Sequence, residues 1–358
     1  HPGPQKSSPS NTQHIKVKKK HHITNHPLIQ TFNRLEGNPK VCLLTEPLWG
    51  IPYNLFFPFF ALYMSSLGVT DQQIGFRMTL GMLLQIVTSF LGGAITDKLG
   101  RRRTTVIFDT IAWVLPSILY VFAQDYRYFI IGAMLNAVFQ VTAISWNCLL
   151  VEDADSNELV NIFTWVTLAG LMSVFFAPLA SLLVSQIGLD LSMRILLGIF
   201  AISMTVKVIV THRYSKETGP GRLRMEASKD VPFHHLLRGY ASVFRSMLKE
   251  PATRIVLIMI VLLNLTIAVT NNFFSLFAIQ NLGLPEHYAG YFPIARAIIM
   301  LIFIYTIQTR LNRLPFKIPM SFGLILYLGA QLALIFAPHA PYVLVALYVL
   351  LDSFAYAL

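Results

Sequence analysis

The chain has 358 residues, of which 54% are apolar and only 13% are charged, and its mean hydropathy is +0.58. A soluble protein this apolar would expose large hydrophobic patches, so the composition excludes a soluble enzyme and indicates an integral membrane protein. The net charge of +11 is confined to short segments between apolar runs, which excludes a continuous groove for nucleic acid.

Residues 1–45 are predicted to form a basic cytoplasmic tail, with residues 1–40 disordered because they cannot build a core. The tail carries the lysines Lys16, Lys18, Lys19 and Lys20, and it lacks the apolar segment of a signal peptide. The lysines could attract anionic lipid headgroups, at about 1 kcal/mol each near the surface. We favour the simpler interpretation, a solvated tail that holds the N-terminus on the inner side.

Ten apolar runs follow, each close to the roughly 20 residues that a helix needs to cross a bilayer. The predicted spans are 47–68, 73–96, 104–124, 128–151, 161–186, 191–211, 254–280, 288–309, 317–337 and 341–358. Alternate connections differ in charge: those predicted to be outer contain no lysine and only Arg127. This asymmetry places the N-terminus in the cytoplasm.

The connection at 213–253 divides the spans into a six-helix half (46–212) and a partial second half of four (254–358). Apolar residues between Phe233 and Leu248 recur at helical spacing, with basic residues between them. We expect an amphipathic helix that lies in the inner interface or packs on the inner ends of the spans. The fold class is therefore all-α, a polytopic membrane helix bundle.

A shift of 215 residues superposes the two halves without gaps. Leu67-Gly68 then meets Leu282-Gly283, Gly75 meets Gly290, and the inner turn at Asp97 meets Asn312. Six spans after residue 254 would need roughly 60 more residues at about 20 per span. We interpret the chain as a truncated twelve-span protein, with a natural ten-span protein as the alternative.

The stretch GAITDKLGRRR at residues 93–103 lies between spans 2 and 3. It resembles the loop 2–3 signature of the major facilitator superfamily, whose members are secondary transporters that work by alternating access between two six-helix halves. The resemblance covers residues 46–358. It implies that the partial second half belongs to the same fold.

The same resemblance implies a cytoplasmic gate. In the family, the signature Asp and Arg form a charge network with an acid at the end of span 4 and lock against span 11, which is absent here. The matching residues in this chain are Gly93, Asp97, Lys98, Gly100, Arg101 and Arg102 in the loop, with Glu152 and Asp153 after span 4. The alternative is a set of exposed ion pairs worth less than about 1 kcal/mol.

Two charges lie near mid-membrane in the second half. Arg296 in span 8 and Asp352 in span 10 have opposite signs and similar depth, which predicts a pair or a shared cavity. We favour a substrate or proton site over a structural ion pair. Arg77, Asp109 and Lys207 lie closer to the ends of their spans, and we assign them no transport role.

Spans 1, 4, 7 and 10 line the central cavity of the resembled fold, and these spans carry polar residues at mid-membrane. The candidate substrate residues are Asn54, Asn136, Gln140 and Asn271. Amides without a strong charge suit a neutral or weakly charged organic solute. The alternative for each residue is an interhelical hydrogen bond, worth about 0.6 kcal/mol.

Span 5 contains small residues at Ser173, Ala177 and Ser181 around Pro178, similar to the Gly-rich motif of drug–proton antiporters. We therefore favour proton-coupled export of a small organic solute, with uptake by symport or a non-transporting membrane sensor as alternatives. We expect a multi-pass monomer in the plasma membrane whose partners are the solute, protons and lipids. We expect no enzymatic activity, cofactor, metal or nucleic acid, because no P-loop, zinc motif or nucleophile elbow occurs.

Overall fold

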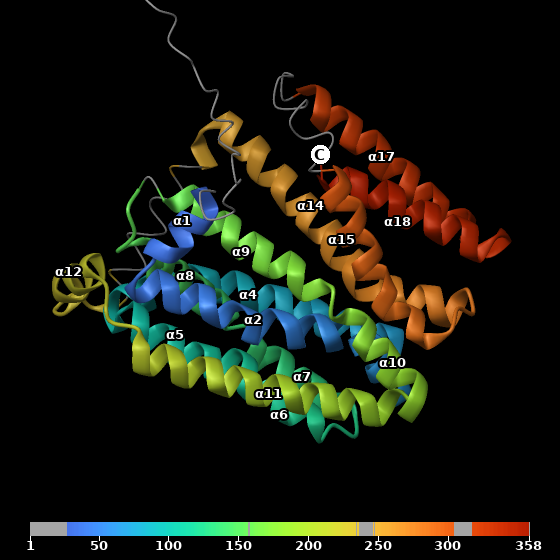
Figure 1. The fold of residues 1–358 in the computed structure, drawn as a ribbon, viewed down its shortest axis with the longest axis horizontal. Coiled ribbons are helices and arrows are strands. Elements are labelled where there is room, and N and C mark those ends of the chain that lie inside the picture. Colours follow the sequence, from blue (N-terminus) through green and yellow to red (C-terminus); the bar gives the residue numbers. More distant parts are fainter. Residues whose placement is uncertain are drawn as a thin grey trace, which may run out of the picture.

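The computed structural model describes residues 27–303 and 317–357, except residues 157, 234, 236–245 and 247. The described part is built from helices packed side by side (Figure 1). The helices of the first half are α1 (Pro27–Arg34), α2 (Gly37–Phe56), η2 (Phe57–Phe59), α3 (Phe60–Ser66), α4 (Asp71–Leu99), α5 (Arg101–Asp109), η3 (Thr110–Val114), α6 (Leu115–Val121), α7 (Tyr126–Asn136), α8 (Phe139–Val151), α9 (Leu159–Val174), α10 (Ala177–Ile187) and α11 (Leu189–Tyr214).

A short linker helix, α12 (Gly219–Ser228), precedes the second half. The second half comprises α14 (Pro251–Leu276), η4 (Phe277–Asn281), η5 (Glu286–Gly290), α15 (Tyr291–Phe303), α17 (Lys317–Phe336), η7 (Ala337–His339) and α18 (Pro341–Ala357). The amphipathic helix expected around residues 233–249 and the inner turn at 310–317 fall largely outside the described residues.

Six helical segments in the described part are long and apolar enough to cross a membrane. They are Asp71–Leu99, Arg101–Val121, Tyr126–Val151, Asn161–Ile187, Leu189–Tyr214 and Ser321–His339. The expected all-helical membrane bundle is confirmed. The first predicted span, 47–68, is one path broken into α2, η2 and α3, because Pro58 removes a backbone donor at the break.

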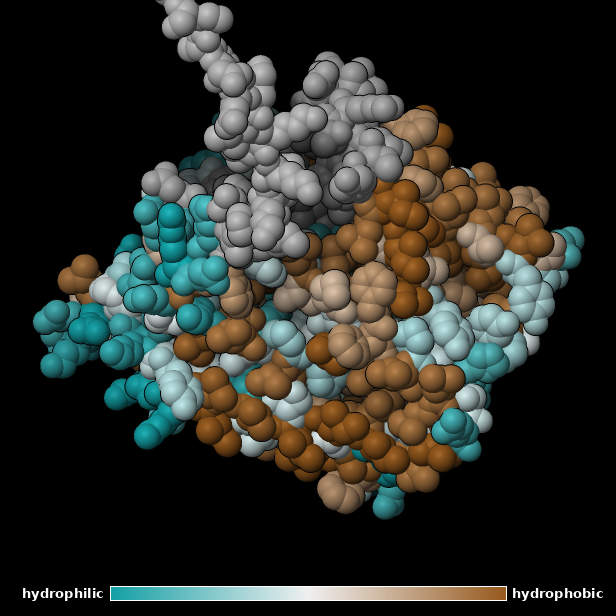
Figure 2. Space-filling model, viewed as in Figure 1, coloured by the Kyte–Doolittle hydropathy of each residue, from teal (hydrophilic) through white to brown (hydrophobic). Residues whose placement is uncertain are grey.

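The lipid-facing surface follows from helical periodicity, and α11 shows it clearly. Ile195, Ile199, Ile202 and Ile209 recur along one face and are exposed, while Phe200 and its neighbours on the other face are buried. Figure 2 shows the result as a hydrophobic band across the helices, with hydrophilic residues gathered at the end that carries α12. We call this end, which contains the α4–α5 turn, the charged end.

Residues 27–40, which were expected to be disordered, instead form α1 and the first turn of α2. Leu35, Cys42 and Leu43 are buried against Leu149 and Ile162 of the first half. These few apolar side chains are enough to order the segment once the C-terminal end of α8 and the N-terminal end of α9 offer a surface. The helix that contains the first predicted span therefore begins at Gly37, about three turns before residue 47.

The main contacts between the two halves lie at the end opposite to the charged end. There η5 packs against α10 and η2, and α14 packs against α3. Gln280 donates a hydrogen bond to Ser65 Oγ at 2.6 Å, and Gly68 and Gly283 of the internal repeat both have positive φ, at 79° and 72°. In Figure 1, α14 and α15 lie next to α9 and α10, with α17 and α18 beyond them.

The small residues of span 5 lie at close approaches between helices. A Cβ on Gly50 of α2 would lie 2.7 Å from Ser173 Oγ, and a Cβ on Gly290 of η5 would lie 2.9 Å from the Ala177 carbonyl oxygen. Span 5 thus packs tightly both within the first half and against the second half, which a stripe of small residues allows.

Candidate functional site

The charged end holds a buried network centred on Arg101. The helix break at Gly100 places Arg101 in the first turn of α5, where its guanidinium is buried between two carboxylates. Its Nε and Nη2 donate to Glu152 at 3.0 Å, and its Nη1 donates to Asp97 at 3.1 Å. We call Asp97, Arg101 and Glu152 the gate cluster.

The linker after α11 packs over the gate cluster. The sequence did not predict this contact. The Glu217 carboxylate accepts from the backbone N–H groups of Arg101 at 2.8 Å and Arg102 at 3.1 Å, and so caps the N-terminus of α5. Thr218, the N-cap of α12, donates its hydroxyl to Glu152. No local signal in the sequence separates Glu217 from the other charges of the 213–253 segment.

The remaining predicted gate residues lie around the same cluster. Lys98 Nζ donates to the Val231 carbonyl at 2.9 Å, and Arg102 Nε donates to the His212 carbonyl at 3.1 Å. Asp153 accepts from Asn38 at 3.2 Å and from the Gly219 backbone at 3.1 Å.

The predicted Gly93 lies on α4, one residue from a close approach of α4 to α8. At that approach, a Cβ on the neighbouring Gly92 would lie 3.3 Å from Val141 Cα of α8.

The Glu152 carboxyl illustrates the electrostatics of the cluster. Burial by itself raises the pKa of this group, but hydrogen bonds from Arg101 and Thr218 outweigh burial and lower the pKa below its ordinary value of 4.5. A folded-state pKa below the unfolded value means that the carboxylate stabilises the fold above the unfolded pKa. This contribution is lost as the pH falls through the lowered pKa.

Gly100 is the hinge of the α4–α5 turn, and we expect Gly100→Ala to release the linker. Its φ of 87° disfavours a side chain, and a Cβ would lie 2.5 Å from Met225 Sδ and 2.6 Å from Glu217 Oε2. The substitution should lower the free energy of unfolding by about 1–3 kcal/mol. It should also speed trypsin cleavage at Arg222 and Arg224, which are exposed but held in α12, because a released linker can unfold into the protease. The rate of cleavage of the purified protein is the measurement.

Gly75→Ala is the matched control for this substitution. Gly75 lies in α4 without a positive φ, and a Cβ at this position would have nothing within 4 Å. The role of Gly100 would be contradicted if both alanine variants were cleaved and unfolded alike.

A second part of the site is a cavity of about 360 Å³ between the two halves. Asn54 of α2 lines it, and its amide donates to the Gly50 carbonyl at 2.8 Å. Arg296 of α15 and Asp352 of α18 line it from the other half and form an ion pair. The two charges that the sequence places at similar depth are thus brought together. We call this the interhalf cavity.

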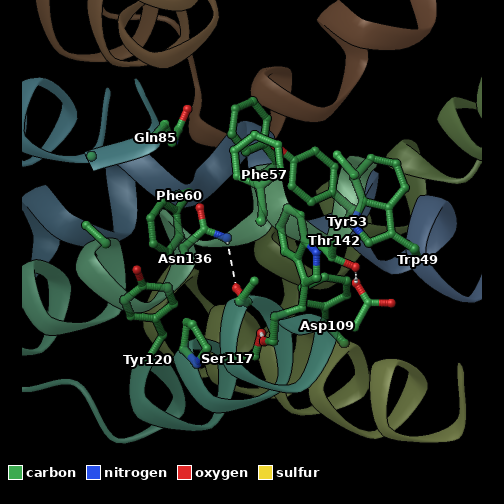
Figure 3. A pocket seen from close by; sticks show the side chains of 18 of the residues that line it. Trp49, Tyr53, Phe57, Phe60, Gln85, Asp109, Ser117, Tyr120, Asn136 and Thr142 are labelled. Carbon is green, nitrogen blue, oxygen red and sulfur yellow. Dashed lines mark hydrogen bonds between the residues drawn. The ribbon is translucent and has the colours of Figure 1, made fainter. Parts of the chain in front are cut away.

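A third part is a cavity of about 560 Å³ within the first half, which we call the first cavity (Figure 3). Asn136 lines it, and its amide donates to the Ala112 carbonyl at 2.9 Å. Gln140 lines neither cavity, and the side chain of Asn271 lies outside the described residues. Tyr53 and Phe57 line both cavities and so connect them.

Sequence reasoning missed four charged residues of the first cavity: Glu46, Arg77, Asp109 and Lys207. Three of them lie near the predicted ends of spans, which gave no reason to assign a role, and Glu46 lies just before predicted span 1. In the structure Asp109 and Lys207 are buried, at 3% and 5% exposure. One feature of the sequence could have identified three of them: Arg77, Asp109 and Lys207 are charged residues within apolar runs, where a charge is costly and often functional.

A sequence model of the Major Facilitator Superfamily matches residues 49–358 of the chain. No curated protein sequence matches this chain. Among solved structures it is similar to the nucleoside transporter NupG, with a TM-score of 0.66 and 17% identity over 90% of this chain and 79% of that one.

It is similar also to a D-xylose–proton symporter, with a TM-score of 0.65 and 15% identity over 89% of this chain and 79% of that one. A further similar structure is the partially occluded, inward-open xylose transporter XylE from E. coli. Its TM-score is 0.63 and its identity 13%, over 89% of this chain and 83% of that one.

Proposed function

Because the chain belongs to the major facilitator superfamily, and is thus a secondary transporter in a membrane, we propose that it moves a small organic solute coupled to protons. The interhalf cavity carries this proposal, since its walls come from both halves and include the Arg296–Asp352 pair. A rocking motion of the halves would expose such a cavity to each side in turn.

The charged end is proposed to face the cytoplasm, with the N-terminus on the same side, in the plasma membrane. The excess of arginine and lysine at this end supports that orientation. The main contacts between the halves lie at the opposite end, which then corresponds to the closed outer side. We further propose that the protein works as a monomer, because the interhalf cavity is lined by one chain.

The Asp352 carboxylate is proposed as the proton-coupling group. It is 6% exposed and paired with Arg296 on the second-half wall of the interhalf cavity. A proton on Asp352 would remove the attraction between α15 and α18 at the cavity wall, and departure of the proton would restore it. The coupled groups therefore have two charge states that solute and proton can select.

We favour export in exchange for protons, since the small residues of span 5 lie at the contact between the halves. Uptake by symport is the second candidate, favoured by the likeness to a D-xylose–proton symporter. A sensor that binds without transporting would keep the cavities, but it would move no protons.

Asp352→Asn is expected to abolish solute-driven proton movement. Asparagine keeps the shape of the side chain but cannot exchange a proton, so coupling should be lost while folding is retained. The measurement uses proteoliposomes with an acidic interior and a trapped pH dye, and adds a nucleoside, a pentose and an aromatic amine in turn outside.

Asp190→Asn is the control, because Asp190 is a half-exposed carboxylate that pairs with Arg194 on the surface of α11. Its proton movement should equal that of the parent protein. Equal proton movement in Asp352→Asn and the parent would contradict the assignment of Asp352. Solute movement without protons would contradict proton coupling itself.

A further inference from the structure

Three ionisable side chains from three helices meet at one end of the first cavity: Glu46 of α2, Asp109 of α5 and Lys207 of α11. Lys207 Nζ lies 3.9 Å from Glu46 Oε2, within an ion pair but beyond hydrogen-bond distance. Lys207 Nζ also lies 5.7 Å from the centre of the Trp146 ring. We call these three residues the buried charge cluster.

The cluster is short of one positive charge when all three groups are ionised. One Asp109 oxygen accepts from Thr142 at 2.8 Å, while Oδ2 is buried without a partner among the described residues (Figure 3). Among the described residues, the buried thiol of Cys42 also lies close to the cluster, and a thiol is neutral in its ordinary form. An unpaired carboxylate in such a site must hold a proton or find a cation.

Arg77 does not fill this deficit, although it lines the same cavity. Its guanidinium hydrogen-bonds to the Tyr120 hydroxyl at 3.4 Å and lies 5.0 Å from the centre of the Phe60 ring. Tyr120 follows Asp109 by 11 residues on one helical path, which corresponds to roughly 16 Å of helix rise. The cavity therefore has a basic end and, separately, an acidic end with an unmatched oxygen.

The wall beside the acidic end is aromatic. Trp49 and Tyr53 of α2 and Phe57 of η2 recur every four residues, and successive rings stack with centroids 4.9 Å apart. Trp113 lies edge-on to Trp49 at 5.8 Å. The buried indole N–H of Trp49 has no partner in the described part of the chain. Such a wall suits a flat, apolar body that bears a hydrogen-bond acceptor.

We infer that the first cavity binds an organic cation, a protonated amine on an aromatic or similar flat body, with its ammonium beside Asp109 and Glu46. When the amine is absent, the cluster holds a proton in its place. As the ammonium enters, that proton leaves the carboxylates for water, so amine and proton exclude each other. This inference names the substrate class of the proposed transporter and rests on that function only for the direction of movement.

Binding is tested on the purified chain in detergent by titration calorimetry, which requires no transport. The probes are 2-phenylethylamine and 2-phenylethanol, which share a body and differ in charge. We expect the amine to bind about 30-fold more tightly than the alcohol. Repeating the titration in two buffers of different ionisation enthalpy gives the number of protons released on binding. We expect close to one proton per amine bound.

Asp109→Asn should weaken amine binding by about 30-fold and suppress proton release. Asp125→Asn is the matched control, since Asp125 caps α7 at the surface and asparagine caps equally well. Should Asp109→Asn fail to fold in a melting assay, Glu46→Gln must give the same loss. The inference is overturned if amine and alcohol bind alike, if neither binds, or if amine binding releases no proton.

The binding experiment and the transport experiment can fail independently of each other. Amine binding without transport of any solute in proteoliposomes would keep the cation site and contradict the transporter. Proton-coupled movement of a nucleoside or pentose, without amine binding, would keep the transporter and overturn the cation site.

Discussion

Arg101→Ala is expected to lower the free energy of unfolding by about 2–3 kcal/mol and to slow transport roughly tenfold. Arg101 is 4% exposed, and its guanidinium holds Glu152 through three hydrogen bonds and Asp97 through one. Its removal leaves two carboxylates facing each other at the charged end. The cost lies below that of a fully buried pair because the side chains of Asp97 and Glu152 keep 18% and 17% exposure.

The two free cysteines supply the readout, since Cys42 is buried and Cys148 is half-buried. A fluorogenic maleimide reports their exposure as the protein unfolds on heating. Arg103→Ala is the control, because Arg103 lies in the same turn and is exposed. Arg101→Lys should fall between the two, since an ammonium keeps the charge but loses the planar fork. Equal melting of the Arg101→Ala and Arg103→Ala variants would contradict a structural gate.

The gate cluster could be predicted from the sequence because most of its chemistry is local. Asp97 and Arg101 are four residues apart in the chain. The acids after span 4 lie beside them once spans 2 and 4 end on the same side of the membrane. The cap that Glu217 supplies could not be predicted. It depends on how a polar segment of about 40 residues folds back, and no periodic pattern fixes that path.

The spans were predictable because apolar runs of membrane length have one physical solution, a helix that satisfies its own backbone. The start of α2 was missed for the opposite reason. Residues 37–46 are mixed in polarity, and they become helical through packing of Leu43 and a hydrogen bond from the Asn38 amide to the Lys216 carbonyl at 2.9 Å. Tertiary contacts of this kind leave no trace in hydropathy.

The Arg296–Asp352 pair could be predicted from the sequence, whereas the Glu46–Lys207 pair could not. Arg296 and Asp352 are predictable as partners because both lie at mid-membrane and their signs are opposite. Glu46, Asp109 and Lys207 each lie close enough to a span end that, considered one at a time, none stands out. Only the packing of α2, α5 and α11 reveals that they line one cavity.

Lys207→Met is expected to have the largest effect within the membrane, a loss of about 3–5 kcal/mol of stability. Methionine fills similar space but leaves the Glu46 and Asp109 carboxylates with no cation beside them. Adding Glu46→Gln should recover about 1–3 kcal/mol of the loss, because the double variant has one carboxylate that a single proton neutralises. The coupling between the two substitutions should reach about 1–3 kcal/mol, obtained from melting of the four proteins in a double-mutant cycle.

Lys229→Met controls for the loss of a lysine, since Lys229 is exposed after α12. The same cycle also tests the cation site. A ligand that binds only the folded state raises its stability in proportion to affinity, and the cavity without Lys207 is more negative. 2-Phenylethylamine should therefore raise the melting temperature of Lys207→Met by more than that of the parent, while 2-phenylethanol should raise both equally. If the amine raised the melting temperature of the parent by as much or more, the negative charge of the Glu46 and Asp109 carboxylates would not be what attracts the ammonium, and the cation site would be contradicted.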